Sequence, residues 1–382
     1  MKYNFDKTAN RLNTSSIKWD VKDNELPMWV ADMDFMAIPE IQEAIINATK
    51  DGAYGYTYPT TDFFESYQYW WNKRHHINIP TSWMIFASGV VSALDSIIRS
   101  LTKENDGILL LTPVYHAFFN IIRNNHRTVV TSTLLESNDY SIDYDDVKNK
   151  IKNCNVKAII FCNPHNPVGR IWGKDEIEEL INICDKYGVY FISDEIHCDI
   201  TDPGYEYCPA LSVKDTVITC LSPGKAFNLA GIHSSVTVVK NEEIRNKLQE
   251  AFYHDDIGEP NYFAIPVNIA AYTKGERYVD ELNEYLYQNK QYVSSFIDNN
   301  LSQLRLVKGH ATYLLWIDIS ALKIRSDVFT DELRKETGLI LYPGNQFGDG
   351  GAYYLRMNVA TSLDNVKDAM NRLKDFIEKK EK

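Results

Sequence analysis

Short apolar runs alternate with amphipathic segments through the middle of the chain. Five of the runs are too short for helices and lack the strict alternation of half-exposed strands, so they predict strands buried on both faces. They are Gly107 to Thr112, Val156 to Cys162, Val189 to Ser193, Val217 to Leu221 and Ser235 to Val239. Asp175 to Tyr187 lies between two of them, has one apolar face and is followed by Gly188, as expected of a helix. This alternation predicts a mostly parallel sheet covered by helices.

The pattern changes near residue 300. A long periodic segment, Gly275 to Leu301, predicts an extended helix. It is followed by the predicted strands and helices of a smaller domain, namely Tyr313 to Ile319, Asp327 to Thr337, Tyr353 to Val359 and Leu363 to Lys379. We therefore expect a large domain at residues 46–285 and a smaller α+β domain at residues 286–382, to which the N-terminal segment, residues 1–45, contributes.

Composition narrows the classes of partner. The chain has 40 basic and 52 acidic side chains and a net charge of −12, which disfavours nucleic acid. No apolar run approaches the roughly 20 residues that cross a bilayer, and no signal peptide is visible, so we expect a cytoplasmic protein that binds no membrane. The six cysteines form no C-x-x-C pair, and we expect buried, reduced thiols and no metal site.

Polar residues follow three of the predicted strands. They are Asn166 in an Asn-Pro-His-Asn-Pro-Val-Gly turn, Asp194, and Ser222 with Lys225. Each has a plain explanation when taken singly, as a turn, a helix cap or a solvated charge. In parallel sheets, however, ligands bind outside the carboxyl ends of the strands, and these residues recur there in a fixed order. The combination is much more specific than its parts.

This combination resembles the pyridoxal 5′-phosphate (PLP) enzymes of the aspartate aminotransferase superfamily, fold type I, and implies an α/β fold with a seven-stranded sheet. The resemblance implies that Lys225 is the catalytic lysine that forms a Schiff base with the cofactor aldehyde. Asp194 would keep the pyridine nitrogen protonated. Asn166 would hydrogen-bond the phenolic oxygen, with His197 as a second partner.

A phosphate cradle is implied where a short strand leads into a helix. Gly89, Val90 and Val91 stand at this turn, where free backbone N–H groups and the helix dipole favour an anion. Ser222 matches the family's phosphate-binding hydroxyl. Tyr115 follows another strand and would stack on the cofactor ring as part of the catalytic set.

Two segments resemble a particular branch, the MalY/PatB-type cystathionine β-lyases or C–S lyases. They are Leu26 to Phe35 and Ser193 to His197. Aminotransferases commonly carry a phosphate-binding arginine where this chain has His233, which leaves the phosphate charge balance open. Tyr56 matches a tyrosine that reaches the partner's cofactor in a homodimer, so the resemblance implies a homodimer.

The substrate site follows from the same resemblance. Arg356 matches the arginine that binds the α-carboxylate of an amino acid, and Asn166, Trp29, Val30 and Tyr56 would complete the site. The expected reaction is β-elimination from cystathionine or another L-cysteine S-conjugate. Two alternatives remain open at this point, namely an aminotransferase and a regulatory protein that retains the fold.

Overall fold

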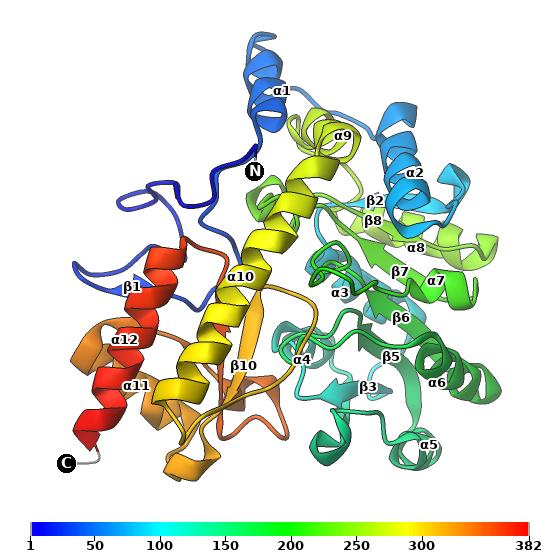
Figure 1. Ribbon diagram of the computed structural model, residues 1–382. Helices are drawn as coiled ribbons and strands as arrows, with labels where there is room; N and C mark the ends of the chain where they lie inside the picture. The colour runs from blue at the N-terminus through cyan, green and yellow to red at the C-terminus, as the bar shows by residue number, and fades with distance from the viewer. Residues whose placement is uncertain (1, 381–382) are drawn as a thin grey trace.

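The computed structural model describes residues 2–380, and its larger unit is built on a seven-stranded sheet (Figure 1). The strand order is β2-β8-β7-β6-β5-β3-β4. Strand β8 is antiparallel to both β7 and β2, and the other pairings are parallel, so the predicted mostly parallel sheet is confirmed. The strands are β2 (Met84–Ala87), β3 (Gly107–Thr112), β4 (Thr128–Thr133), β5 (Val156–Cys162), β6 (Tyr190–Asp194), β7 (Ile218–Leu221) and β8 (Ser235–Val238).

Four of these strands differ from the expectation, and β7 and β8 differ least, since β7 begins one residue late and β8 ends one residue early. Strand β6 begins one residue late and includes Asp194, so this carboxylate stands on the last residue of the strand. Strand β4 was not predicted, because it lies at the edge of the sheet and four of its six residues are threonine or serine. An edge strand buries less of its length than a central one and therefore lacks the apolar run.

Helices cover both faces of the sheet. Alternate side chains of β3 point in opposite directions, so Ile108 and Leu110 enter one core while Leu109 and Leu111 enter the other. The first core is covered by α3 (Val90–Leu101), α4 (Ala117–Asn124) and α8 (Glu242–His254). The second is covered by α2 (Thr61–His75), α5 (Tyr144–Asn153), α6 (Lys174–Tyr187), α7 (Ala210–Val213) and α9 (Ala264–Lys274), with α1 (Pro39–Thr49) against α9.

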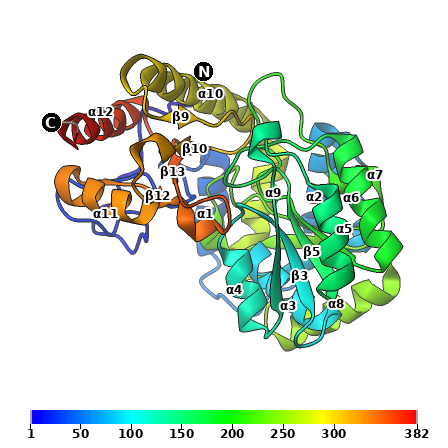
Figure 2. The ribbon, with the colours of Figure 1, turned by 90° about the horizontal axis from the view of Figure 1, so that it is seen from below.

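The smaller unit is built on a four-stranded antiparallel sheet in the order β12-β13-β10-β9. Figure 2 shows it beside the large unit, with helices along its outer side. Its elements are β9 (Arg305–Leu306), β10 (Leu314–Asp318), α11 (Ser326–Thr337), β11 (Leu339–Ile340), β12 (Tyr342–Pro343), β13 (Tyr354–Asn358) and α12 (Leu363–Lys380).

Both units also contain short 3₁₀ turns. They are η1 (Thr81–Trp83), η2 (Glu136–Asn138) and η3 (Ala230–Ile232) in the larger unit, and η4 (Ser320–Leu322) and η5 (Gly344–Phe347) in the smaller one.

Two segments connect the units. Helix α10 (Glu276–Asn300) runs along both, and the predicted boundary after residue 285 falls inside it, so the domain limits stay a prediction (Figure 1). Strand β1 (Leu26–Pro27) pairs in parallel with β11. Residues 26–27 therefore lie against the smaller unit, whereas α1 packs against α9 of the larger one, and the assignment of residues 1–45 to the smaller domain stays a prediction.

Two further predictions concern membranes and thiols. Among residues 2–380, the longer helices are too polar to cross a bilayer. All six cysteines are free, and Cys162, Cys184, Cys198 and Cys220 are buried. The expectation of burial is wrong for the exposed Cys154, which caps the end of α5 at the surface, and for the partly exposed Cys208.

Candidate active site

A cavity of about 360 Å³ opens at the carboxyl ends of the parallel strands. Polar groups from strand ends, from the start of α3 and from the turn after β7 share its wall. It brings together most of the predicted cofactor-binding residues, namely Gly89, Val90, Val91, Tyr115, Asn166, Asp194, His197, Ser222 and Lys225. Segments far apart in the sequence therefore meet where the strand ends predict a ligand site.

Asp194 is a buried carboxylate with little to neutralise it. It stands in register with Cys162 of β5 and Cys220 of β7, both buried, and is itself 5% exposed. One of its oxygens accepts a hydrogen bond from the Ile196 N–H at 3.1 Å. Burial raises the pKa of Asp194 to about 6, against the opposing effects of that hydrogen bond and of Lys225. A cationic group in the cavity would stabilise the ionised carboxylate.

Lys225 lies on the turn that follows β7. Ser222 Oγ shapes the turn, because it accepts from the Gly224 N–H at 3.0 Å and donates to the Ser234 carbonyl at 2.7 Å. The Lys225 amine donates to the Ala31 carbonyl at 2.6 Å. Burial, and secondly the Arg356 guanidinium, lowers the pKa of Lys225 to about 8, although nearby carboxylates oppose this shift. A neutral amine is therefore accessible close to neutral pH.

Asn166 and His197 stand beside these two groups. The Asn166 N–H donates to Cys162 Sγ at 3.4 Å, and its side-chain oxygen accepts from Arg356. His197 is buried, and burial, together with Lys225 and Arg356, holds its pKa well below the usual range. Its Nδ1 is buried without a hydrogen-bond partner in the described part of the chain. His197 is therefore a neutral ring with an unused polar atom.

The start of α3 fits an anion. Gly89 has a φ of 130°, and a Cβ placed there would meet nothing within 4 Å, so the backbone is open to the cavity. The first N–H groups of a helix have no intrahelical acceptor. Ser222 and His233 also line the cavity, and His233 is exposed. The anion-binding turn, the buried Asp194 and the weakly basic Lys225 fit the phosphate, the ring nitrogen and the aldehyde of PLP.

Arg356 adjoins the cavity but is not among its lining residues. Its guanidinium lies between the rings of Tyr342 and Phe347, 4.9 Å from each centroid. It donates to Asn166 Oδ1 at 3.1 Å and to the Trp29 carbonyl at 3.0 Å. Burial lowers its pKa to about 10, which leaves it cationic at neutral pH. The contact with Asn166 brings this cation to the edge of the cavity.

Trp29 and Val30 were expected in the substrate site; they are not among the residues that line the cavity, and their role there stays a prediction. The Trp29 ring stacks on Tyr342 with 5.9 Å between centroids. The Val30 carbonyl accepts from Asn358 Nδ2 at 2.6 Å. Their visible contribution is to hold the segment that carries them against β13.

Tyr56 is fully exposed and does not line this chain's cavity. Tyr54 and Tyr58 are exposed as well, whereas Tyr67 and Trp70 of the same aromatic-rich stretch are buried in the core. The stretch therefore divides into an exposed and a buried part. The predicted role of Tyr56 at a partner's cofactor stays a prediction.

Two residues of this region were not singled out from the sequence. Tyr342 forms one side of the Arg356 site, and the Tyr313 hydroxyl donates to the Ala31 carbonyl at 2.9 Å. Neither carries a local signal, because a tyrosine before or within a strand reads as a core residue. Only the packing of the smaller unit against the N-terminal segment brings them to the site.

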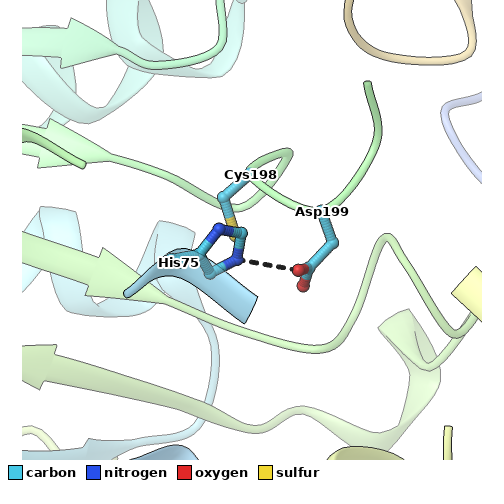
Figure 3. Close-up of side chains that lie close together, drawn as sticks. All are labelled: His75, Cys198 and Asp199. Atoms are coloured by element: carbon cyan, nitrogen blue, oxygen red, sulfur yellow. Dashed lines mark hydrogen bonds and ion pairs between the residues drawn. The ribbon is translucent and has the colours of Figure 1, made fainter. Parts of the chain in front are cut away.

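A second polar cluster lies outside the cavity. His75, Cys198 and Asp199 offer ligand atoms within 4.8 Å of one another (Figure 3). The Asp199 carboxylate already accepts hydrogen bonds from His75 Nε2 at 2.9 Å and from Trp70 Nε1 at 3.0 Å. The Arg74 guanidinium lies 3.4 Å from the same carboxylate. A metal ion there would have to compete with a guanidinium, which makes the cluster a poor cation site.

Comparison with known proteins agrees with this geometry. Residues 26–373 match the model of the class I and II aminotransferases. A curated relative, cystathionine β-lyase PatB of Bacillus subtilis, is 34% identical, and the match covers 97% of this chain and 99% of PatB.

Two solved structures are also similar. A PLP-bound protein from Clostridium difficile, provisionally assigned as an aminotransferase, is 39% identical with a TM-score of 0.95, covering 98% of this chain and 100% of that one. A PLP-bound C–S lyase from Staphylococcus hominis is 30% identical with a TM-score of 0.92, covering 98% of each chain. The chain therefore belongs to the class I and II aminotransferase family.

Proposed function

We propose that the chain is a PLP-dependent C–S β-lyase that converts L-cysteine S-conjugates such as cystathionine into a thiol, pyruvate and ammonia. The observation that carries the proposal is one cavity in which Lys225, with its lowered pKa, faces the under-neutralised Asp194 beside the Asn166–Arg356 contact. PatB and the Staphylococcus hominis protein, which are named for such activities, support it.

When bound, PLP supplies an aldehyde for the amino group and a cationic ring that accepts electrons from the substrate's Cα. Lys225 would hold the aldehyde and Asp194 the ring nitrogen. The N–H groups at Gly89, Val90 and Val91 would hold the phosphate. Tyr115, which lines the same cavity, would cover the ring face.

The chain's own residues divide the work on the substrate. Arg356 would bind the α-carboxylate, which fixes the direction of the Cα–H bond. The Lys225 amine would accept the Cα proton as general base, and its pKa of about 8 suits proton transfer near neutral pH. The electron pair of that bond forms the Cα–Cβ double bond as the thiolate leaves. Water then converts the released enamine into pyruvate and ammonia.

Transamination is the second candidate, and the provisional assignment of the Clostridium difficile relative favours keeping it. Both reactions begin with removal of the Cα proton by Lys225. The test is to incubate the holoenzyme with S-methyl-L-cysteine in the absence of any 2-oxo acid. A β-lyase releases thiol and pyruvate in equal amounts over many turnovers. An aminotransferase stops after one turnover and resumes only when a 2-oxo acid is added.

The thiol part of the substrate needs a separate experiment. A panel of L-cysteine S-conjugates, from S-methyl-cysteine to cystathionine, would be scored by thiol release. A preference for cystathionine, measured as kcat/KM, would make that compound the preferred substrate, and a flat profile would indicate a general cysteine-conjugate lyase.

The assembly is a further part of the proposal. We propose a homodimer, because Tyr56 is fully exposed and would serve the partner's cofactor. We also propose that this dimer acts in the cytoplasm. The test mixes inactive Tyr56→Ala subunits with inactive Lys225→Ala subunits. A hybrid dimer would contain one site with both defects and one with neither, so recovered activity supports a shared site. Persistent inactivity despite demonstrated hybrids counts against it.

A further inference from the structure

The segment of residues 28–35, called the N-terminal strap below, is held to the site through its carbonyl groups. Arg356 and Lys225, the two basic side chains that the proposed reaction needs, both donate to it. Other donors come from β13 and from the turn after Lys225. The acceptor and donor pairs are Met28 with the Asn358 N–H, Trp29 with Arg356, Val30 with Asn358 Nδ2, Ala31 with Lys225 and Tyr313, and Met33 with Asn228 Nδ2.

The Ala31 carbonyl has a special position in this set. It accepts from the Lys225 amine at 2.6 Å and from the Tyr313 hydroxyl at 2.9 Å, so both of its lone pairs are used. Tyr313 is fully buried, and burial raises its pKa well above the usual range, which keeps the hydroxyl protonated as a donor. A hydroxyl has one hydrogen to donate, and this one is directed at Ala31.

The backbone around Tyr313 is fixed from two sides. The Val359 N–H donates to its carbonyl at 2.9 Å, and the Thr312 N–H donates to the Ile200 carbonyl of the large unit at 2.9 Å. The Tyr313 ring also packs edge-on against His197, with 6.0 Å between centroids. Tyr313 therefore links the smaller unit, the strap and the cavity wall at one point.

We propose that Tyr313 is a positioning residue of the reaction, because it fixes the Ala31 carbonyl as the acceptor that orients the Lys225 amine during proton transfer. This proposal rests on the proposed role of Lys225 as general base. An amine that donates one N–H to a fixed acceptor keeps its lone pair in a narrow range of directions. When the Cα–H bond breaks, the proton joins the Lys225 nitrogen and the electron pair of that bond forms the Cα–Cβ double bond. The electron pair of the broken Cβ–S bond leaves with the thiolate.

The same contact influences the charge of Lys225. The groups that act on it electrostatically are Arg356, which opposes its positive charge, and Asp32 and Asp194, which favour it; His197 is a further buried neighbour. Removing the Tyr313 hydroxyl leaves the Ala31 carbonyl with Lys225 as its remaining side-chain donor. The carbonyl then stabilises the ammonium form more strongly. The lysine should consequently become a weaker base catalyst at neutral pH.

The experiment compares Tyr313→Phe with Tyr278→Phe, a matched control whose buried hydroxyl has no hydrogen-bond partner in the described part of the chain. For Tyr313→Phe we expect kcat to fall about tenfold with KM nearly unchanged, the loss expected for one positioning hydrogen bond. The isotope effect with Cα-deuterated substrate should rise and the acid limb of kcat should move to higher pH. The control should change none of these.

A readout on the apo-protein separates this proposal from the proposed function. The pH dependence of Lys225 labelling by an amine reagent, followed by mass spectrometry, should shift to higher pH in Tyr313→Phe. Replacing Tyr313 by 3-fluorotyrosine, a stronger donor of the same shape, should shift it to lower pH. Unchanged kcat, isotope effect and labelling in both variants would overturn the positioning role, even if wild-type lyase activity is present. Absence of lyase activity in the wild type would instead reject the proposed function.

Discussion

Asp194 and Asp199 are both buried and lie close together in the sequence, yet their surroundings differ. Asp199 accepts from His75 and Trp70 and has the Arg74 guanidinium beside it. Burial acts to raise the pKa of Asp199, but these partners outweigh burial and lower it. Asp194 lacks such partners, and burial raises its pKa to about 6. A carboxylate that the fold itself neutralises is structural, whereas one left under-neutralised in a cavity is prepared for a ligand.

Glu195 shows which partners matter. It accepts from Ser193, Ala210 and the Tyr207 hydroxyl, and burial still raises its pKa to about 7. Hydrogen bonds from neutral donors therefore do not offset burial at this position. Asp199 differs from Glu195 in having the Arg74 guanidinium, a permanent positive charge, 3.4 Å from its carboxylate, and its pKa is lowered.

Three lysines away from the surface differ in the same way, by whether an acidic side chain lies beside the amine. Lys18 lies 2.9 Å from Asp34, and Lys290 lies 2.6 Å from Asp202, so both of these buried amines are ion-paired. Lys225 is partly buried and, within residues 2–380, donates to a backbone carbonyl and forms no ion pair. The cavity thus contains a carboxylate and an amine that the fold has left available.

The largest effect should come from Asp194→Asn. The variant should still bind PLP, but kcat should fall by about 10³-fold or more, because an amide cannot keep the ring nitrogen protonated. Steady-state thiol release measures the loss, and visible absorbance confirms that the cofactor is bound. Near-normal turnover would contradict the proposal that Asp194, in contrast to Asp199, is needed for the reaction.

Arg356→Ala should cost about 2 to 5 kcal/mol in kcat/KM for substrates that carry an α-carboxylate. The reason is the loss of a buried cation that would pair with that carboxylate. A substrate analogue without the carboxylate is the control. Equal losses for both compounds would indicate a folding defect in place of lost recognition.

Asp199→Asn should act on stability. We expect the free energy of unfolding to fall by about 3 kcal/mol, because the half-buried Arg74 and His75 lose the charge of a fully buried hydrogen-bonding partner, although Arg74 keeps its contact with Asp280. Urea unfolding of the apo-protein measures this change. The kcat of the folded variant should stay within about threefold of wild type, an activity change worth less than about 1 kcal/mol. A loss of turnover as large as that of Asp194→Asn would erase the distinction between the two carboxylates.

The smallest effect is the pH dependence of apo-protein stability. The folded pKa of Asp194 is raised to about 6, so its ionised form destabilises the fold above that pH, and protonation relieves the cost as the pH falls. Asp194→Asn should therefore be more stable than wild type by about 2 kcal/mol at pH 8, with the difference fading below pH 6. Asp199 has a lowered pKa, so its contribution is present above the unfolded pKa and is lost in acid. A constant difference for Asp194→Asn across this range would contradict the raised pKa.

The sequence predicted the central strands and the residues at their ends, because apolar runs and strand-end polar groups are local patterns. It missed β4, an edge strand with a polar composition. It predicted Trp29 and Val30 in the substrate site, which stays a prediction; in the structure their contacts hold the strap to β13 and Tyr342. The roles of Tyr313 and Tyr342 depend on packing between segments that are far apart in the sequence. A local sequence pattern cannot predict such contacts.

The central claim is that Lys225 is the amine left available for PLP. The most direct measurement is borohydride reduction of the holoenzyme followed by mass spectrometry of its peptides. We predict one reduced cofactor per chain, attached to Lys225, with Lys18 and Lys290 unmodified because each is held in a buried ion pair. Attachment of the cofactor to either of those lysines, or to any lysine outside the cavity, would contradict it.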